Sequence, residues 1–261
     1  MWFDLRQPAR RAGPGFDITV SGAAWLGRCL DVLYGAYAWL ALLVIAIPVA
    51  VAFLVTPGVS RRRRLAHWAA KAFLAAIGSR VHVTGLKFLE AGPCVVVANH
   101  ASYLDGIILA AVLPPKFSFL IKHEMAAVPI AGFVLRRLGS EFVDRENAGH
   151  RHRTARRLLA GTSNGDAFVV FPEGTFDRPI GLRRFQRGAF LAAWRGKSAV
   201  VPAVIHGARR KLPAAAWLPA PGPLAVTISA PLPARAYPDA MALLAATRAA
   251  LLAHLEEPDL A

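Results

Sequence analysis

The chain of 261 residues carries 31 Lys and Arg against 16 Asp and Glu, which gives a formal net charge of +15. Hydrophobic residues make up 55% of the sequence, and this content excludes a disordered chain, because disordered segments lack the apolar surface that offsets the entropy lost on ordering. The length predicts one large domain or two small ones. The positive charge favours partners that bear phosphate, such as nucleic acid, an anionic lipid surface or a phosphorylated small molecule.

The first distinctive segment is an uncharged stretch over residues 32–60, whose centre, 33–55, is rich in Leu, Ile, Val, Phe and Ala. It is long enough to cross a membrane, and its apolar residues favour insertion by roughly 4 to 7 kcal/mol. More cations follow the stretch, at 61–64 and Lys71, than precede it, at Arg28. This asymmetry predicts an inner-membrane protein whose remainder faces the cytoplasm. Pro48 leaves open a bent, monotopic segment instead.

A second helix is expected at 65–77, where apolar residues recur at helical spacing: Leu65, Trp68, Ala69, Ala72, Phe73, Ala76 and Ile77. Such a face lies either on a membrane surface or against the core of the domain that follows. We therefore expect a membrane-anchoring region over residues 1–79 and a second domain over residues 80–261.

The second domain alternates between strand and helix patterns. Strands are expected at 80–84, 94–98, 117–122, 141–144, 167–171, 199–205 and 224–229. Helices are expected at 105–113, 129–138, 147–159, 185–194 and 239–255. This alternation predicts an α/β fold, with a mixed, largely parallel sheet flanked by helices and preceded by the hydrophobic helix. Residues 209–223, rich in Ala and Pro, are expected to form a surface excursion.

The first candidate site runs from Asn99 to Asp105, directly after the apolar strand at 94–98. In such sheets the crevice beyond the carboxyl ends of the strands holds ligands. His100 and Asp105, five residues apart across a strand-to-helix turn, can form a hydrogen bond that leaves the second ring nitrogen as a general base. The alternative is that His100 caps a turn and Asp105 caps a helix.

Three further motifs follow or begin strands. The sequence FPEGT at 171–175 places the carboxylate of Glu173 at a strand end and allows a tight turn at Gly174, although an ordinary turn would have the same composition. At 141–145, Arg145 could hold a phosphate with two hydrogen bonds or pair with Asp144. Pro202, near the start of the strand at 199–205, is expected at a sheet edge or a strand entry.

The two cysteines, Cys29 and Cys94, cannot form a disulfide framework, and the sequence contains no CxxC, HExxH or Cys/His array. We therefore expect no structural metal and no cofactor. Cys94 is expected to behave as a small buried hydrophobic residue.

Taken together and in this order, the motifs resemble those of the lysophospholipid acyltransferase family, which includes bacterial 1-acylglycerol-3-phosphate acyltransferases. The resemblance covers roughly residues 60–207. It implies that His100 deprotonates the hydroxyl of the acceptor, that Asp105 orients His100, and that the oxygen attacks an acyl thioester directly. The acceptor-binding residues that it implies are Arg145, Glu173, Gly174, Thr175, Lys122 and Arg187. It also places Val201 and Pro202 near the acyl donor.

The resemblance implies a membrane-associated O-acyltransferase that uses acyl-CoA or acyl carrier protein and first of all acylates 1-acylglycerol-3-phosphate to phosphatidate. Many phosphatidate-forming members carry a basic or small polar residue where this chain has Phe176. Another lysophospholipid or a lyso-ornithine lipid is therefore an alternative acceptor. The partners are then the lipid acceptor, the acyl donor and the bilayer.

Two alternatives come from other functional classes. A nucleic-acid-binding protein is suggested by the basic run at 150–157, but this run lies on one expected helix and no recognised nucleic-acid-binding signature accompanies it, so we expect no nucleic-acid partner. A non-catalytic lipid-binding protein on the same fold is less favoured, because His100, Asp105 and Glu173 are all retained.

Overall fold

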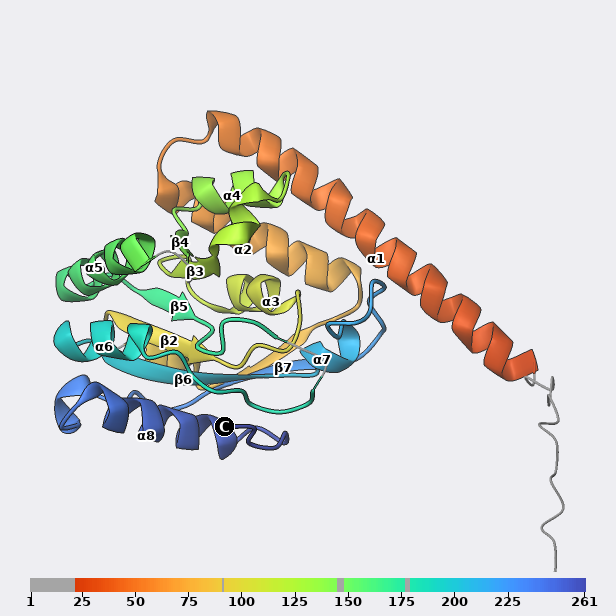
Figure 1. The fold of residues 1–261 in the computed structure, drawn as a ribbon. Coiled ribbons are helices and arrows are strands. Elements are labelled where there is room, and N and C mark those ends of the chain that lie inside the picture. Colours follow the sequence, from red (N-terminus) through yellow and green to blue (C-terminus); the bar gives the residue numbers. More distant parts are fainter. Residues whose placement is uncertain (1–21, 91, 145–147, 177–178) are drawn as a thin grey trace, which may run out of the picture.

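A computed structural model describes residues 22–90, 92–144, 148–176 and 179–261 (Figure 1). Its centre is a seven-stranded sheet with the strand order β1-β7-β6-β2-β5-β3-β4. The strands are β1 (Val81–Thr84), β2 (Cys94–Ala98), β3 (Ser118–Lys122), β4 (Glu141–Val143), β5 (Phe168–Val170), β6 (Ala199–His206) and β7 (Leu224–Ile228). Each lies within about two residues of an expected strand.

The sheet is parallel at every described pairing except that of β6 with β7, which is antiparallel. The expected α/β fold with a mixed, largely parallel sheet is therefore confirmed. All five residues of β2 are buried, because β5 and β6 flank this strand and helices cover both faces. Its side chains alternate between the two cores: Val96 belongs to one cluster and Val97 to the other.

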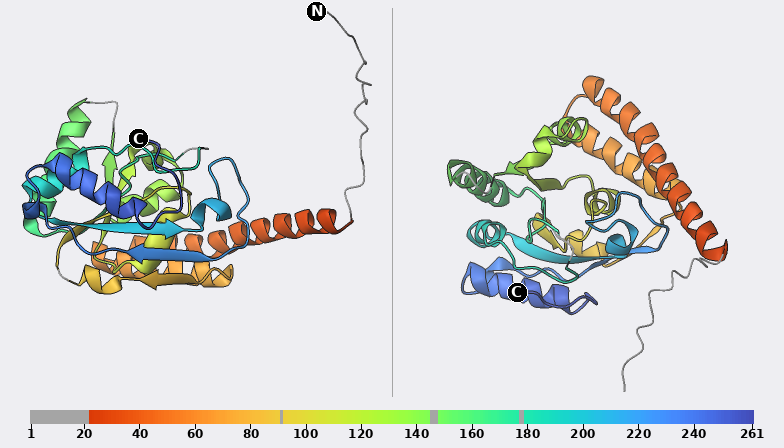
Figure 2. Two further views of the ribbon diagram at one scale, coloured as in Figure 1. Left: turned by 90° about the horizontal axis from the view of Figure 1, so that it is seen from below. Right: turned by 45° about the vertical axis from the view of Figure 1, so that its right-hand side comes forward.

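The helices form a layer on each side of the sheet. They are α1 (Gly22–Val55), α2 (Val59–Ala76), α3 (Asp105–Val112), α4 (Ala131–Arg137), α5 (Ala148–Asn164), α6 (Gly188–Arg195), α7 (Ala208–Lys211) and α8 (Ala240–Leu252). Three short 3₁₀ helices, η1 (Leu86–Leu89), η2 (His123–Ala127) and η3 (Ala234–Ala236), were not expected. Helices α2 and α3 pack on one face of the sheet, and α6 and α8 pack on the other (Figures 1 and 2).

Helix α2 differs from its expectation in its start and in its buried face. It begins at Val59, so the arginines at 61–64 lie within the helix. Its buried residues are Ala70, Phe73 and Leu74, whereas Trp68 of the expected apolar face is 65% exposed. The reason is that α2 packs against α3 and contributes to the core of the sheet. Core packing, one of the two alternatives, is therefore what the structure shows for the helix, on a face rotated from the expected one.

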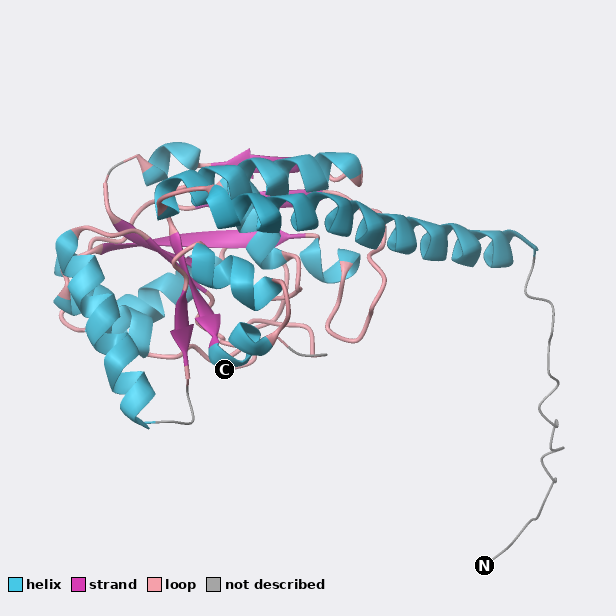
Figure 3. Cartoon of the chain, turned by 90° about the horizontal axis from the view of Figure 1, so that it is seen from above, coloured by secondary structure: helices cyan, strands magenta, loops and turns pink. Residues whose placement is uncertain are grey.

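Helix α1 begins at Gly22 and not at residue 33, and its N-terminal part projects beyond the rest of the domain (Figure 3). Trp25–Val55 is long and apolar enough to cross a membrane. It runs antiparallel to α2, since the hydroxyls of Tyr34 and Tyr37 donate to the carbonyls of Ile77 and Ala76, each over 2.9 Å. α1 and α2 thus form one hairpin. The boundary expected between 79 and 80 stays a prediction.

Pro202 marks neither a sheet edge nor a strand entry, because β6 lies between β7 and β2 and Pro202 is the fourth of its eight residues. Pro202 has no N–H, and in a strand the N and C=O of one residue point to the same side. The carbonyl of Pro202 accepts from the N–H of Ser229, just beyond the end of β7, and the next pairing on that side is the bridge between Val200 and Leu232. The absent N–H of Pro202 therefore points toward the place where the hydrogen bonding between β6 and β7 ends.

Residues 209–223 are not simply a surface excursion. α7 ends at Lys211, which is 1% exposed, and its Nζ donates to the hydroxyl of Tyr34 on α1 over 2.9 Å and to the carbonyl of Ala220 over 3.1 Å. The segment is anchored because α1 lies beside it and supplies a polar partner within an apolar surface. The sequence pattern of the segment itself contains no sign of this contact.

Candidate active site

The centre of the site is the turn between β2 and α3. His100 Nδ1 lies 2.8 Å from Oδ2 of Asp105, the first residue of α3. The same oxygen accepts from the backbone N–H groups of Ala101 over 2.7 Å and Ser102 over 2.8 Å. Asp105 is fully buried and the His100 side chain is 19% exposed. The expected contact is present, whereas the alternative is wrong: Asp105 is the first residue of α3 and does not cap it, and it accepts instead from N–H groups of the preceding turn.

The imidazole of His100 is held by aromatic rings. Phe171 stacks on it with 4.3 Å between ring centroids and 19° between planes, and Phe176 meets it at 4.5 Å and 64°. Tyr103 contacts Phe176 in turn, at 4.7 Å. With Nδ1 bound to Asp105 and the ring packed in this way, Nε2 is the nitrogen left for a substrate.

Glu173 joins the turn to a second loop. Its Oε1 accepts from the backbone N–H of His100 over 2.7 Å, and its Oε2 accepts from that of Arg183 over 2.8 Å. The side chain is 4% exposed, and burial raises the pKa of its carboxyl, although both backbone hydrogen bonds oppose this shift. Gly174, with φ of 76°, lets the chain turn directly after it. In this structure Glu173 therefore positions two loops, and its direct contact with an acceptor stays a prediction.

Asn99 fixes the other side of the turn, a role that sequence reasoning missed. It is 3% exposed, its Nδ2 donates to the carbonyl of Ile205 over 3.1 Å, and its Oδ1 accepts from the N–H of Ile205 over 2.7 Å. These two bonds join the ends of β2 and β6. A polar residue directly between a buried strand and the histidine was the available signal, but its partner is 106 residues away.

The loop that carries Arg183 is held by the C-terminal segment, which sequence reasoning also missed. Arg248 on α8 donates to the carbonyls of Leu182 over 2.8 Å and Arg183 over 2.7 Å, and it forms an ion pair with Asp259. The N–H of Leu182 donates to the carbonyl of Pro258 over 2.8 Å. A chain of contacts therefore runs from the C-terminal segment through Arg183 and Glu173 to His100.

Arg209 adds a second tie to the same segment. Its Nε and a terminal nitrogen each donate to the carboxylate of Glu257 over 2.8 Å, which makes a two-pronged ion pair. The positive charge of Arg209 also lowers the pKa of Glu173, as a smaller influence than burial.

The other expected acceptor residues are less closely assembled. Lys122 ends β3 and pairs with Glu124 over 2.8 Å, with both side chains exposed. Thr175 and Arg187 are exposed, and the N–H of Gln186, next to Arg187, donates to the carbonyl of Pro172 over 2.8 Å. Arg145 lies outside the described residues.

Val201 and Pro202, expected near the acyl donor, are buried in β6, where they pair with Val96 and Val97 of β2. The structure therefore leaves neither side chain on the surface, and their contact with a donor stays a prediction. Cys94 is buried as expected, and burial raises the pKa of its thiol to about 11.

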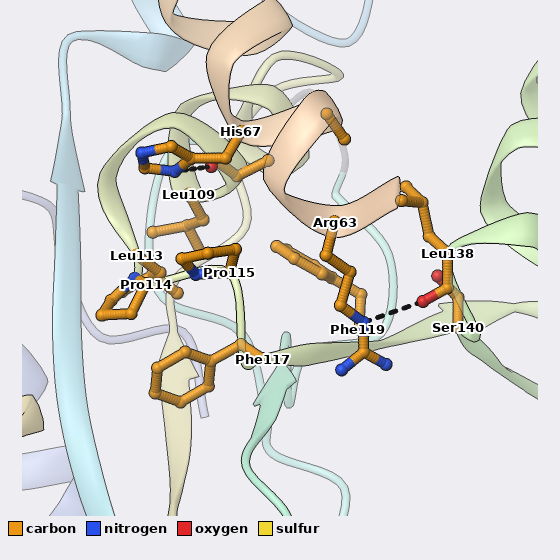
Figure 4. A pocket seen from close by; sticks show the side chains of 12 residues that line it. Arg63, His67, Leu109, Leu113, Pro114, Pro115, Phe117, Phe119, Leu138 and Ser140 are labelled. Carbon is orange, nitrogen blue, oxygen red and sulfur yellow. Dashed lines mark hydrogen bonds between the residues drawn. The ribbon is translucent and has the colours of Figure 1, made fainter. Parts of the chain in front are cut away.

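A small pocket of about 40 Å³ lies between α2, α3 and β3 (Figure 4). Its walls are mostly apolar, while Arg63 donates to the carbonyl of Leu138 and His67 Nδ1 lies 2.9 Å from the carbonyl of Ala110. This volume holds on the order of three waters and no acyl chain. Neither His100 nor Asp105 lines it. In the described part of the chain, no group of three metal-binding side chains is arranged to hold a metal ion, and metal-free chemistry stays a prediction.

Comparison with known proteins finds relatives that are named for lipid acylation. The family model described as "Acyltransferase" matches residues 80–206, which include His100, Asp105 and Glu173. Over 132 residues the chain is 33% identical to the 1-acyl-sn-glycerol-3-phosphate acyltransferase of Saccharomyces cerevisiae, covering 49% of this chain and 44% of the relative. Over 152 residues it is 32% identical to the lyso-ornithine lipid O-acyltransferase of Pseudomonas aeruginosa, covering 58% and 57%.

The fold has a similar solved structure, the 1-acyl-sn-glycerophosphate acyltransferase PlsC of Thermotoga maritima. The TM-score is 0.72 at 22% identity, covering 87% of this chain and 94% of the other. The chain spans about half the length of the curated relatives that it matches. The family model matched to residues 80–206, the series of similar relatives and the shared fold together confirm the resemblance of this chain to the lysophospholipid acyltransferase family.

Proposed function

We propose that this protein is a membrane-associated O-acyltransferase that moves a fatty acyl group from a thioester to the hydroxyl of a lysophospholipid. The observation that carries the proposal is the 2.8 Å contact between His100 Nδ1 and the buried carboxylate of Asp105. The names of the relatives supply the acceptor class. The net charge of +15 favours acyl-CoA or an acidic acyl carrier protein as the donor.

The chemistry follows from the tautomer that Asp105 selects. His100 carries a proton on Nδ1, and this N–H group forms a hydrogen bond to the carboxylate of Asp105. The unprotonated Nε2 then takes the proton from the acceptor hydroxyl while the oxygen attacks the carbonyl carbon of the thioester. The tetrahedral intermediate collapses, the carbon–sulfur bond breaks, and the leaving thiolate receives the proton from the imidazolium. The products are an ester and a free thiol, with no covalent enzyme intermediate.

In this proposal the protein contacts the membrane through α1, and we call the exposed apolar face of this helix the membrane seat. This face includes Leu40, Val44, Ile47 and Val51, spaced three or four residues apart and 49% to 63% exposed. The opposite side packs on the protein from Gly35, which lies against Leu218, to Phe53, which is fully buried. That contact extends over about 27 Å of helix, nearly the thickness of a hydrocarbon core. A crossing helix would pull the folded domain into the bilayer, so we favour a monotopic α1 that lies in the cytoplasmic leaflet.

An apolar groove of about 210 Å³ opens along this seat, between α1 and the start of α4. Its lining includes Val51 and Leu54 from α1 together with Ile130 and Phe133. Because it is open and apolar, it offers an acyl chain a path along the lipid side of the domain.

The first acceptor that we propose is 1-acylglycerol-3-phosphate, with lyso-ornithine lipid as the alternative. Relatives of both names match the chain. The alternative is supported by Phe176, because its ring packs against both His100 and Tyr103 and places no cation at this position beside the imidazole.

The test is acyl transfer by the full-length protein in detergent or vesicles. Labelled acyl-CoA and acyl carrier protein are each offered with lysophosphatidate, other lysophospholipids and lyso-ornithine lipid, and His100→Ala is the matched blank. We expect product from lysophosphatidate. Product only from another acceptor would make Phe176 a specificity determinant, and no product from any acceptor would overturn the proposal.

A further inference from the structure

The segment that follows α7 is an unusually apolar surface loop. Residues 212–223, which we call the apolar loop, read LPAAAWLPAPGP and contain no charged side chain. Trp217 is 86% exposed and Leu218 is 40% exposed. Solvent-facing loops normally carry polar residues, and exposed apolar patches mark sites where a partner or a membrane binds.

The loop is fixed to α1 and not free to move away from it. The indole Nε1 of Trp39 donates to the carbonyl of Trp217. A Cβ at Gly35 would lie only 2.6 Å from Cβ of Leu218, so the glycine permits the close approach. At the base of the loop, Lys211 donates to the hydroxyl of Tyr34 over 2.9 Å.

Apolar side chains are exposed both on the loop and on the neighbouring part of α1. On α1 next to the loop, Leu33 is 65% exposed, Tyr37 49% and Leu40 59%. The loop lies beside α1 in both views of Figure 2. Neither residues 32–60 nor residues 212–223 contain a charge. Tryptophan, with its large apolar ring and single N–H, is a residue type that concentrates at the boundary between lipid headgroups and acyl chains.

We propose that the apolar loop is a second membrane-contacting element, which places Trp217 in the headgroup region beside α1. The proposal rests on the membrane seat of α1 proposed above. A lipid bilayer is the occupant that fits, because the loop is hydrogen-bonded to the helix proposed to lie in the membrane and contains no charged side chain for a protein partner. The loop and α1, about 180 residues apart in sequence, then both contact the same leaflet. Together they fix how α1 is rotated about its axis and how far the active site lies above the lipid.

The test locates single residues relative to the bilayer. In a Cys29→Ser background, Trp217→Cys, Val44→Cys and Met241→Cys are each labelled with an environment-sensitive fluorophore in the full-length protein. Cys94 stays unlabelled because it is buried and its thiol has a pKa of about 11. Val44 is on the exposed face of α1, and Met241 is an exposed apolar residue of α8 that serves as the matched control. A further variant, Ala215→Cys, keeps Trp217.

The labelled proteins are reconstituted in vesicles of phosphatidylcholine and phosphatidylglycerol. We expect lipid-borne spin labels to quench the fluorophores at 44, 215 and 217, and aqueous iodide to quench the one at 241. Quenching of 215 and 217 by iodide, with 44 in lipid, would overturn the loop contact and leave the seat of α1 intact.

Two other outcomes also overturn the proposal. If iodide quenches all four positions, the membrane seat fails with it. If neither quencher reaches 215 and 217, a protein surface such as a second copy covers the loop. Acyl transfer is assayed separately, so neither result bears on the chemistry at His100.

Discussion

The turn around His100 and the surface formed by α1 and the apolar loop are built on opposite physical principles. At the turn, directional hydrogen bonds from backbone N–H groups hold two buried carboxylates, Asp105 and Glu173, in single orientations. On the α1 surface, large apolar side chains face outward, and few hydrogen bonds fix them. Proton transfer needs fixed atoms, whereas lipid contact needs only apolar area. These different requirements explain why the turn is polar and closely hydrogen-bonded, whereas the α1 surface is apolar and exposed.

The variant that separates the two regions most sharply is His100→Ala. Because the imidazole is the proposed base and does not touch the α1 surface, we expect turnover to fall by about two to four orders of magnitude. Vesicle flotation should stay unchanged. Initial rates with the preferred acceptor and flotation of the same preparation give both values. Retained turnover would contradict the base, and lost flotation would contradict the independence of the regions.

The scaffold of the turn is tested by Asn99→Ala. The change leaves the buried N–H and carbonyl of Ile205 without their partner, at a cost of about 1–3 kcal/mol for each buried group. We expect a loss of roughly 2–4 kcal/mol in the free energy of unfolding, measured by urea titration in detergent. Asn164→Ala, at the exposed end of α5, is the matched control, and its effect should stay within about 0.5 kcal/mol. Equal effects would show that the two bonds contribute nothing.

The C-terminal tie is tested by Arg248→Ala. Its guanidinium holds two carbonyls of the loop whose Arg183 N–H binds Glu173, so we expect a loss of about 1.5–3 kcal/mol and a fall in turnover smaller than that of His100→Ala. Arg248→Lys keeps the charge without the planar guanidinium, so its stability and turnover should lie between those of the wild type and those of Arg248→Ala. Arg195→Ala, exposed on α6, is the control. Full turnover at normal stability in Arg248→Ala would remove this contact from the site.

The parts of the molecule that sequence predicts well depend on neighbours along the chain. The apolar run at 94–98 coincides with β2, because a strand buried on both faces has a continuous apolar sequence. The contact of His100 with Asp105 spans only five residues, so its spacing across the turn is enough to predict it. The order of the motifs along the chain is the basis of the family resemblance. The match of the family model to residues 80–206 confirms this resemblance.

The parts that sequence predicts poorly depend on distant neighbours. Glu173 is bound by backbone N–H groups, which leave no trace in a side-chain pattern. The buried face of α2 follows from where α3 lies, and the central place of Pro202 follows from a break in β7. Arg63, counted as a free cation in the charge pattern, donates to the carbonyls of Leu138 and Lys116, and burial lowers its pKa.

The smallest expected effect sharpens the electrostatic side of the comparison and concerns Glu173→Gln. Burial raises the pKa of Glu173, so over the interval between its ordinary value and the raised one the folded protein holds a proton that the unfolded chain has lost. The contribution of Glu173 to stability is therefore fully present below the ordinary pKa and is lost as the pH rises through the raised one. The unfolding free energy of the wild type minus that of Glu173→Gln should fall across this interval and then level off.

Urea titrations of both proteins at a series of pH values give this difference, and Glu256→Gln, at an exposed glutamate, provides the baseline. A difference that rises with pH would mean that the two backbone hydrogen bonds outweigh burial, and that Glu173 is held as a carboxylate. The turn would then contain two fixed negative charges beside His100, and the imidazolium formed during acyl transfer would be stabilised by both, because an opposite charge close to a group favours its charged form.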